Sequence, residues 1–259
     1  MRKLAYEFLL DLGFQLDLLA KVVARLPRAM RRRTLIADQL FQAGIRVVHV
    51  VLLVGLFIGM IVSLQTGLEL SRFGQQDQIG TIVALSMCRE MGPFITATIL
   101  AATVGSALAA ELGTMAVSEE LAALEVMSID RVSFLILPRV ISLAVMGPLL
   151  TVLCDAISIV GGGFIASSQL NVGLALYYDS AFDALKDTDF PLGLPKDVYS
   201  GLFKAFTFGL VVAVISCAAG LQARQGALGV GNATRKAVRD SIIAIIVINY
   251  FLSWFFFQI

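Results

Sequence analysis

Two adjacent charged residues, Arg89 and Glu90, lie within an apolar stretch that runs from residue 79 to residue 112. Charge at membrane depth is costly, so a charged side chain there usually faces a cavity or a partner and marks a functional path. Gly92 and Pro93 follow at once, where a helix can break or kink. We therefore expect a functional site around the pair. The alternative, that the two charges only neutralise each other, is disfavoured because adjacent residues on a helix do not face one another.

A third polar residue, Gln65, lies near the outer end of the preceding apolar run. A rise of about 1.5 Å per residue places Arg89 and Glu90 roughly 15 Å from the outer start of their own run. All three could therefore share one polar spot in the outer half of the membrane. The apolar residues expected to wall this cavity are Val62, Leu68, Leu70 and Phe73. An apolar cavity with a few charges suits an amphiphile with a headgroup.

The composition identifies the class of protein that carries this site. The chain has 259 residues, of which 58% are hydrophobic and 15% charged, with a mean hydropathy of +0.86. A soluble domain has about 25% charged residues, so we predict an all-α protein that crosses a membrane several times. The net charge of +1 indicates no class of partner, and no nucleic-acid motif is evident. The cysteines Cys88, Cys154 and Cys217 lack metal-ligand spacing, and we expect no metal site.

Five apolar segments are candidate membrane-spanning helices. Their approximate ranges are 47–68, 79–112, 134–166, 201–221 and 241–258. A helix needs about 20 residues to cross roughly 30 Å of hydrocarbon, so the second and third segments must tilt, kink or protrude. The expected kinks are at Gly92-Pro93 and at Gly147-Pro148.

Lysines and arginines are concentrated before residue 47, within 111–139 and within 222–240. The positive-inside rule places these segments in the cytoplasm, so we expect a cytoplasmic N-terminus and an external C-terminus. Basic residues expected on the opposite side are Arg72, Lys186, Lys196 and Lys204. The outer loop, about 168–200, also contains Asp179, Asp183, Asp187 and Asp189. These aspartates could bind a cation, but a solvated loop or short helix is the better interpretation.

Residues 1–35 are expected to form an amphipathic helix on the inner membrane surface. Apolar residues recur there at steps of three and four: Leu4, Phe8, Leu12, Leu16, Leu19, Val23 and Leu26. Charged residues interleave with them, which is typical of an interfacial helix rather than of a span. The alternative is a soluble helix that packs on another protein.

Small residues occupy every fourth position in the first two spans. They are Gly55, Gly59, Ser63 and Gly67 in span one, and Ala97, Ala101, Gly105, Ala109 and Gly113 in span two. Such columns let membrane helices approach closely. They favour packing within one subunit, with packing between subunits or a sliding surface as the alternatives.

A cytoplasmic helix is expected at about 118–130, between spans two and three. Ser118 can cap this helix, which places Glu119 and Glu120 in a first turn where the helix dipole favours them. An apolar stripe follows at helical spacing: Leu121, Leu124 and Met127. The stripe and the acidic face suit docking in a groove of another protein, and the alternative is a helix lying on the membrane. Because the chain has no G-x-x-x-x-G-K-[ST] loop, another subunit must supply any energy.

Three segments resemble the MlaE/YrbE permeases: FIGMIVSLQTGLEL, ALSMCREMGPFITATILAATVGSALAAELG and AELGTMAVSEELAALEVMSIDRVSFLILPR. These permeases are the membrane subunits of ABC transporters that work with MCE-domain proteins on lipids. The resemblance covers residues 36–259 as one permease domain and is most specific in 85–139. It implies a homodimer in a bacterial inner (cytoplasmic) membrane, with an outward-opening cavity between the subunits that holds a phospholipid.

The resemblance also implies roles for particular residues. Polar positions of the lipid cavity match Gln65, Arg89 and Glu90, and its apolar wall matches Val62, Leu70 and Phe73. Glu69 stands where related permeases carry an apolar residue. The coupling helix that docks on the ATPase matches Glu119, Glu120, Leu121, Leu124, Glu125, Met127, Asp130 and Arg131. We hypothesise that Arg89 holds the lipid phosphate and that Glu90 tunes that charge or gates the site.

The implied partners are two copies of an ABC ATPase, a periplasmic MCE-domain protein, phospholipid and, in some systems, a STAS-domain protein. ATP and Mg²⁺ bind to the ATPase, and the chain itself is expected to have no cofactor and no catalytic residue. A rival hypothesis is an ion-coupled secondary transporter in which Arg89 and Glu90 relay ions. Five spans without a detectable inverted repeat count against it. A third hypothesis is a membrane scaffold in which the two charges have no role.

Overall fold

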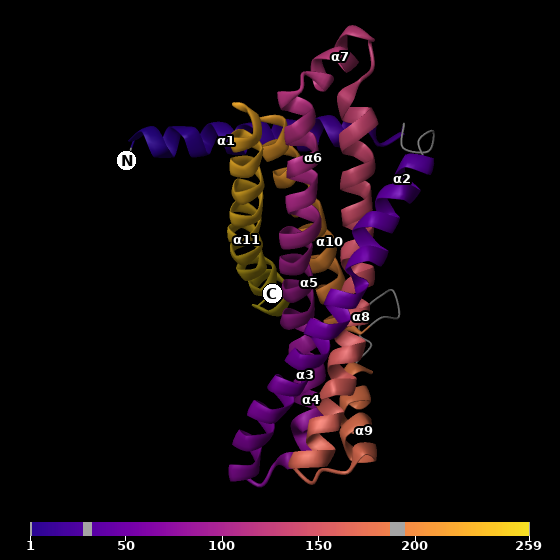
Figure 1. Ribbon diagram of the computed structural model, residues 1–259. Coiled ribbons are helices and arrows are strands. Elements are labelled where there is room, and N and C mark those ends of the chain that lie inside the picture. The colour runs from indigo at the N-terminus through magenta and orange to yellow at the C-terminus, as the bar shows by residue number, and fades with distance from the viewer. Residues whose placement is uncertain (1, 28–32, 187–194, 259) are drawn as a thin grey trace. The chain divides into compact units, whose positions relative to one another are not determined.

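The computed structural model describes residues 2–27, 33–186 and 195–258. Within these ranges the chain forms helices and short turns without any strand, and five helical segments are long and apolar enough to cross a membrane (Figure 1). The predicted all-α membrane fold with five spans is confirmed. Parts of the predicted interfacial helix and outer loop, including Asp187 and Asp189, lie outside the described residues.

The chain begins with α1 (Arg2–Arg25). Span one contains α2 (Arg33–Leu40), the π-helical turn η2 (Phe41–Ile45) and α3 (Arg46–Arg72). Span two contains the 3₁₀ turn η3 (Gln76–Gln78), α4 (Ile79–Ser86), η4 (Met87–Met91), α5 (Gly92–Leu100), η5 (Ala101–Gly105) and α6 (Ser106–Val117). The short helix α7 (Glu120–Val126) follows. Span three contains η6 (Val132–Ile136) and α8 (Leu137–Gln169). After α9 (Leu174–Leu185), spans four and five are α10 (Lys196–Leu221) and α11 (Gly226–Gln258).

The fifth helix begins well before residue 241, where the apolar run was predicted to begin. Helix α11 begins at Gly226 and carries Arg235, Lys236 and Arg239, which had been assigned to a cytoplasmic connection. Hydropathy detects only the apolar part of a helix, whereas helical backbone hydrogen bonding continues into the polar part at residues 226–240. Two of these basic residues have acidic partners, Asp11 for Lys236 and Asp240 for Arg239.

Span two is interrupted at the predicted kink. The π-helical turn η4 (Met87–Met91) directly precedes Gly92-Pro93. Pro93 has no N–H and cannot bond the carbonyl oxygen of Arg89 four residues earlier. Single π-helical turns of this kind are frequent at functional sites. At the second expected kink, Pro148 lies inside the continuous helix α8.

The chain forms two compact units. The first unit comprises Met1–Arg46, Thr98–Met146 and Thr207–Val247, and the second comprises Val47–Ala97, Gly147–Phe206 and Ile248–Ile259. The core of the second unit joins spans two and three with α9. Its buried members are Ile79, Val83, Met87, Ile165, Ala166, Leu170, Val172 and Tyr177. The Tyr177 hydroxyl donates to the Ile159 carbonyl at 3.1 Å, which ties α9 to α8.

Small residues bring α3 and α8 together in the second unit. The Ser63 hydroxyl donates to the Gly162 carbonyl at 2.9 Å, and the Ser158 hydroxyl donates to the Gly55 carbonyl at 2.7 Å. At Gly59 an added Cβ would overlap the backbone of Ser158. The predicted column in span one therefore packs within a single chain.

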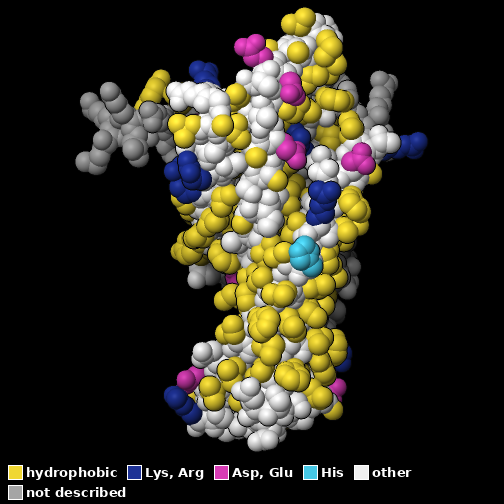
Figure 2. Space-filling model, in the orientation of Figure 1, with side chains coloured by type: hydrophobic (Ala, Val, Ile, Leu, Met, Phe, Trp, Pro, Cys, Tyr) yellow, Lys and Arg dark blue, Asp and Glu magenta, His cyan; other side chains and the backbone are white. Residues whose placement is uncertain are grey.

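The opposite side of α3 is apolar and exposed. Leu53, Phe57 and Ile61 recur every fourth residue on it, and each side chain is more than half exposed. Hydrophobic side chains also cover much of the face drawn in Figure 2. An apolar exterior is expected of helices whose surroundings are lipid or other membrane helices.

We predict that Gly59→Ala lowers the stability of the protein by about 1–3 kcal/mol, because the new methyl group meets backbone that cannot turn aside. The matched control is Gly231→Ala on α11, where an added Cβ meets nothing within 4 Å. Alanine favours helix by about 1 kcal/mol over glycine, so the control should be neutral or stabilising. Thermal unfolding in detergent measures both, and equal midpoints for the two variants would contradict the packing described.

Candidate functional site

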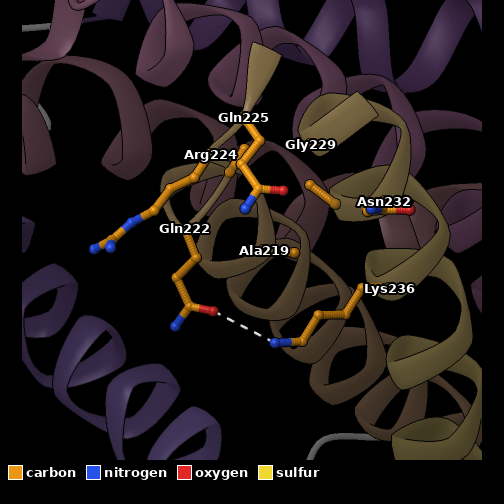
Figure 3. A pocket seen from close by; sticks show the side chains of 9 residues that line it. Ala219, Gln222, Arg224, Gln225, Gly229, Asn232 and Lys236 are labelled. Carbon is orange, nitrogen blue, oxygen red and sulfur yellow. Dashed lines mark hydrogen bonds between the residues drawn. The ribbon is translucent and has the colours of Figure 1, made fainter. Parts of the chain in front are cut away.

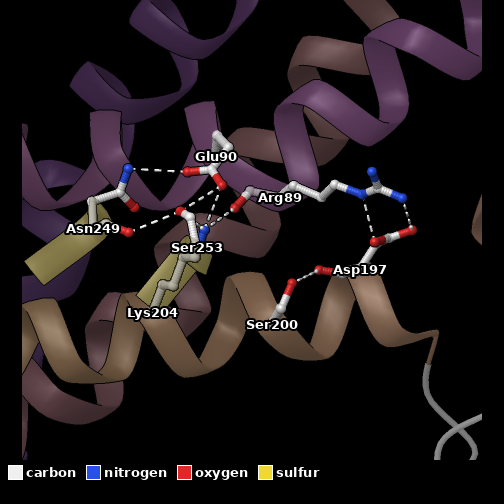
Figure 4. A network of polar contacts seen from close by, with 7 residues as sticks. All are labelled: Arg89, Glu90, Asp197, Ser200, Lys204, Asn249 and Ser253. Carbon is white, nitrogen blue, oxygen red and sulfur yellow. Dashed lines mark hydrogen bonds and ion pairs between the residues drawn. The ribbon is translucent and has the colours of Figure 1, made fainter. Parts of the chain in front are cut away.

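Arg89 forms a two-point ion pair with the first turn of α10. Its Nε donates to Asp197 Oδ1 at 2.5 Å, and its Nη2 donates to Asp197 Oδ2 at 3.0 Å (Figure 4). Both residues belong to the second unit. Such fork-shaped pairing fixes both side chains and is stronger than a single neutral hydrogen bond.

Glu90 is held by three other side chains of the same unit. Lys204 Nζ donates to Glu90 Oε1 at 2.6 Å, and Asn249 Nδ2 donates to Oε2 at 3.0 Å. The Ser253 hydroxyl donates to Oε1 at 2.8 Å while accepting from Lys204 at 2.8 Å. The carboxylate therefore joins α10 and α11 to span two.

Lys204 completes the network at the broken turn of span two. Its ammonium donates to the Arg89 carbonyl at 3.0 Å, an oxygen to which Pro93 cannot donate because proline has no N–H. The Lys204 side chain is 0% exposed. It was predicted among the basic residues of the outer side, and the structure places it within α10, where it contacts the Glu90 carboxylate. The cations Arg89 and Lys204 and the carboxylates Asp197 and Glu90, with the neutral Asn249 and Ser253, thus form a network with no net charge.

The arrangement excludes mutual neutralisation of Arg89 and Glu90, since each has its own counterion on α10. Sequence reasoning missed four members of the network, although spacing carried a signal for them. Asp197 and Lys204 are seven residues apart, and Asn249 and Ser253 are four apart, so each pair lies on one helix face. The rule applied to Arg89, that charge inside an apolar run marks a site, applies equally to Lys204.

The other predicted cavity residues separate into two groups. Val62 and Leu70 pack against the buried core of the second unit that contains Met87. Gln65 and Phe73 are exposed, and the hydrogen bonds of the described residues connect Gln65 to neither charge. Glu69 forms an exposed ion pair with Arg72 at 3.2 Å.

The helix predicted between spans two and three is shorter than expected. Helix α7 covers Glu120–Val126, and the preceding Glu119 adopts a left-handed backbone conformation with φ of 62°. Ser118 does not cap it, because its hydroxyl donates to Thr114 at the end of α6 and to the Glu120 carboxylate. Met127, Asp130 and Arg131 therefore follow the helix rather than belong to it.

Apolar side chains of α7 and of the residue after it differ in their exposure to solvent. Leu121 is buried, whereas Val126 is 87% exposed and Met127 is also exposed. The exposed apolar pair lies at the end of the helix, and Glu125 beside it binds Arg131 at 2.9 Å. The predicted apolar stripe of Leu121, Leu124 and Met127 assumed that the helix continues beyond residue 127. Because the helix ends at Val126, the prediction included Met127 but missed the exposed Val126.

Helix α1 is tied to the segment that follows α7. Arg25 Nε donates to Asp130 Oδ2 at 2.5 Å, and Asp130 Oδ1 accepts from the Val132 N–H at 3.1 Å. Burial would raise the pKa of Asp130, but the hydrogen bond and charge of Arg25, with the backbone bonds, outweigh burial and hold that pKa below its ordinary value. Asp130 thus anchors both α1 and the start of η6.

A pocket of about 330 Å³ and a second of about 290 Å³ also lie in the first unit. The smaller one has a mixed polar and apolar lining: Ala219, Gln222, Ala223, Arg224, Gln225, Gly229, Asn232, Ala233 and Lys236 (Figure 3). Lys236 donates to Asp11 of α1 at 2.6 Å and to Gln222 at 3.4 Å. Among the described residues, no group of histidine, cysteine and acidic side chains is arranged to hold a metal ion.

Comparison with known proteins identifies relatives along most of the chain. The family model described as Permease MlaE matches residues 36–255. A probable ABC transporter permease protein of Rickettsia conorii is 37% identical over 226 residues, covering 87% of this chain and 84% of the relative. A probable ABC transporter permease protein of Synechocystis is 38% identical over 233 residues, covering 89% and 84%. The chloroplastic protein TRIGALACTOSYLDIACYLGLYCEROL 1 of Arabidopsis thaliana is 37% identical over 221 residues, covering 85% and 61%.

We predict that Lys204→Met destabilises the protein by about 3 kcal/mol, because it leaves the Glu90 carboxylate without its counterion. Adding Glu90→Gln should recover most of the loss, since the remaining groups are neutral. Thermal midpoints of the single and double variants measure the coupling. A Lys204→Met protein as stable as wild type would show that the ion pair is not needed.

We predict that the Arg25–Asp130 contact weakens in acid. A carboxylate with a lowered pKa contributes stability above its unfolded pKa of about 3.9 and loses it as the pH falls through the lower folded value. Amide hydrogen exchange, corrected for its intrinsic pH dependence, should accelerate in α1 at acid pH and, in Arg25→Gln, already at neutral pH. Lys21→Gln, which breaks only an exposed pair with Asp17, is the control. Equal protection in both variants would refute the anchor.

Proposed function

The chain belongs to the MlaE permease family, and we propose that it moves phospholipid across or out of the membrane as part of a complex with an MCE-domain protein. It is a multi-pass membrane subunit of the ABC transporter permease type, as are its relatives by name, and such a permease works with an ATPase. The observation that carries the lipid proposal is a neutral, partly exposed charge network inside apolar spans. The lipid in the printed name of the Arabidopsis relative supports it.

We place the lipid headgroup at Arg89. Its side chain is 39% exposed, while the Asp197 side chain that it grips is 10% exposed. A phosphate that reaches this guanidinium has to share it with Asp197 or replace Asp197. Sharing keeps the Asp197 carboxylate paired, whereas full replacement would leave that carboxylate unpaired in a poorly solvated site, so we expect the phosphate to bind the exposed side of the guanidinium. Glu90 holds Lys204 in place.

We place the ATPase at α7. The exposed Val126 and Met127 provide an apolar contact, and Glu119, Glu120 and Glu125 add exposed carboxylates to the same short segment. Movement imposed there reaches Asp130, which anchors α1 and caps η6 at the start of span three. In this proposal two copies of the permease pair with two ATPases in a bacterial inner membrane, with the N-terminus in the cytoplasm and the C-terminus facing the periplasmic MCE protein, and in some systems with a STAS-domain protein.

The test is lipid movement by the purified complex in liposomes. A fluorescent phospholipid should leave the permease-containing membrane only when the ATPase is present and ATP is supplied. Arg89→Ala should reduce the rate about tenfold or more, as expected for loss of a charge-assisted bond of about 1.5–3 kcal/mol. Asp197→Asn should retain more lipid in the purified complex, because the competing anion is gone.

The control variant is Arg72→Ala, which removes an exposed arginine from an exposed ion pair and should leave transport unchanged. Each variant is first shown to assemble with the ATPase. Equal transport by wild type and Arg89→Ala would refute headgroup binding. Transport driven by an ion gradient without ATPase would instead support the secondary-transporter hypothesis.

A further inference from the structure

Asp155 is an intramembrane carboxyl group without a visible partner. It lies on α8 within span three and belongs to the second unit. Its Oδ1 atom is buried and has no hydrogen-bond partner. The ion pairs of the described residues assign no cation to it. Neither the lipid site nor the α7 segment uses this residue.

The carboxyl group rests on the bare backbone of Gly92. A Cβ added at Gly92 would overlap the Asp155 carboxyl group, so only glycine leaves room for it at the start of α5. One turn further along α5, Thr96 Oγ1 is also buried and lacks a hydrogen-bond partner. Positions 92 and 96 share a helix face. Thr96 also lies beside Cys154, the residue before Asp155.

The charges around Asp155 do not offer it a counterion. Among the described residues, the Asp155 carboxylate acts electrostatically on the thiols of Cys88 in η4 and Cys154 in α8, and Asp197 acts on the same Cys88 thiol. The nearby cations of spans two and four, Arg89 and Lys204, are bound to Asp197 and Glu90. Asp155 is partly buried, and its Oδ1 atom is fully buried without a partner, so an ionised carboxylate here is unfavourable in a medium that cannot solvate that oxygen.

We infer that Asp155 is a proton-binding site, where the carboxylate takes one proton from water and stays a neutral carboxylic acid while α8 packs against Gly92. The neutral acid can donate its O–H bond, and the buried Thr96 hydroxyl on α5, which lies beside Cys154, has a lone pair that can accept one. Release of the proton creates a charge that needs water or a cation. Either one has to enter between α8 and the start of α5, directly after the turn that carries Arg89 and Glu90.

The direct test is infrared spectroscopy of the assembled complex at neutral pH. Protein labelled with carbon-13 in the aspartate side-chain carboxyl should show a protonated-acid C=O band that shifts relative to unlabelled protein. The band should vanish in Asp155→Asn and persist in Asp183→Asn, which alters an exposed carboxylate paired with Lys186. Absence of the band in labelled wild type, or its survival in Asp155→Asn, would overturn the inference.

A second measurement does not depend on activity. The wild-type complex should lose thermal stability as the pH rises, because the folded state holds a proton that the unfolded chain releases. Asp155→Asn resembles the protonated side chain in size and charge, so it should flatten this pH dependence while remaining folded. A variant with the same pH dependence as wild type would overturn the inference. If Asp155→Asn does not assemble, the isotope shift in wild type decides.

Discussion

Lipid hydrocarbon cannot solvate a charge, so every ionised side chain within the spans has to find its partner inside the protein. The second unit meets this requirement by distributing two cations and two carboxylates over spans two and four, with Asn249 and Ser253 of span five completing the coordination of Glu90. None of these ion pairs lies within one helix. Helix α10 therefore cannot move away from span two without exposing charge, and the network sets which spans pack together.

The same network repairs the backbone of span two. Glycine and proline at positions 92 and 93 interrupt regular hydrogen bonding, and the ammonium of Lys204 supplies a donor to the carbonyl of Arg89. A lysine is suited to this dual role because one ammonium group has three N–H bonds, one for the carbonyl, one for Glu90 and one for Ser253. The same ammonium group therefore pairs the Glu90 charge and bonds the backbone of span two, so a change that displaces Lys204 affects both contacts.

Sequence reasoning predicted the five spans because hydrophobic composition over about 20 residues is a direct record of the membrane environment. It predicted that Arg89 and Glu90 need separate partners but did not find them, because partners such as Asp197 are distant in sequence and pairing depends on how the helices meet. Hydropathy also failed where a helix leaves hydrocarbon, as at the start of α11. The Ser118 cap was wrong because its hydroxyl bonds backward to α6 and to Glu120, a local competition that residue type alone does not reveal.

The two anchors of α1 have a consequence for the order of folding. One anchor, Arg25 with Asp130, joins residues 105 positions apart, and the other, Asp11 with Lys236, joins residues 225 positions apart. Helix α1 is synthesised before spans one to five, yet the lysine that fixes its middle is synthesised only with span five. Long-range contacts of this kind form late because the chain between them has to be ordered first. Docking of α1 is thus a late step of biogenesis. A nascent chain that stops before α11 can form the Arg25–Asp130 contact but not the Asp11–Lys236 contact.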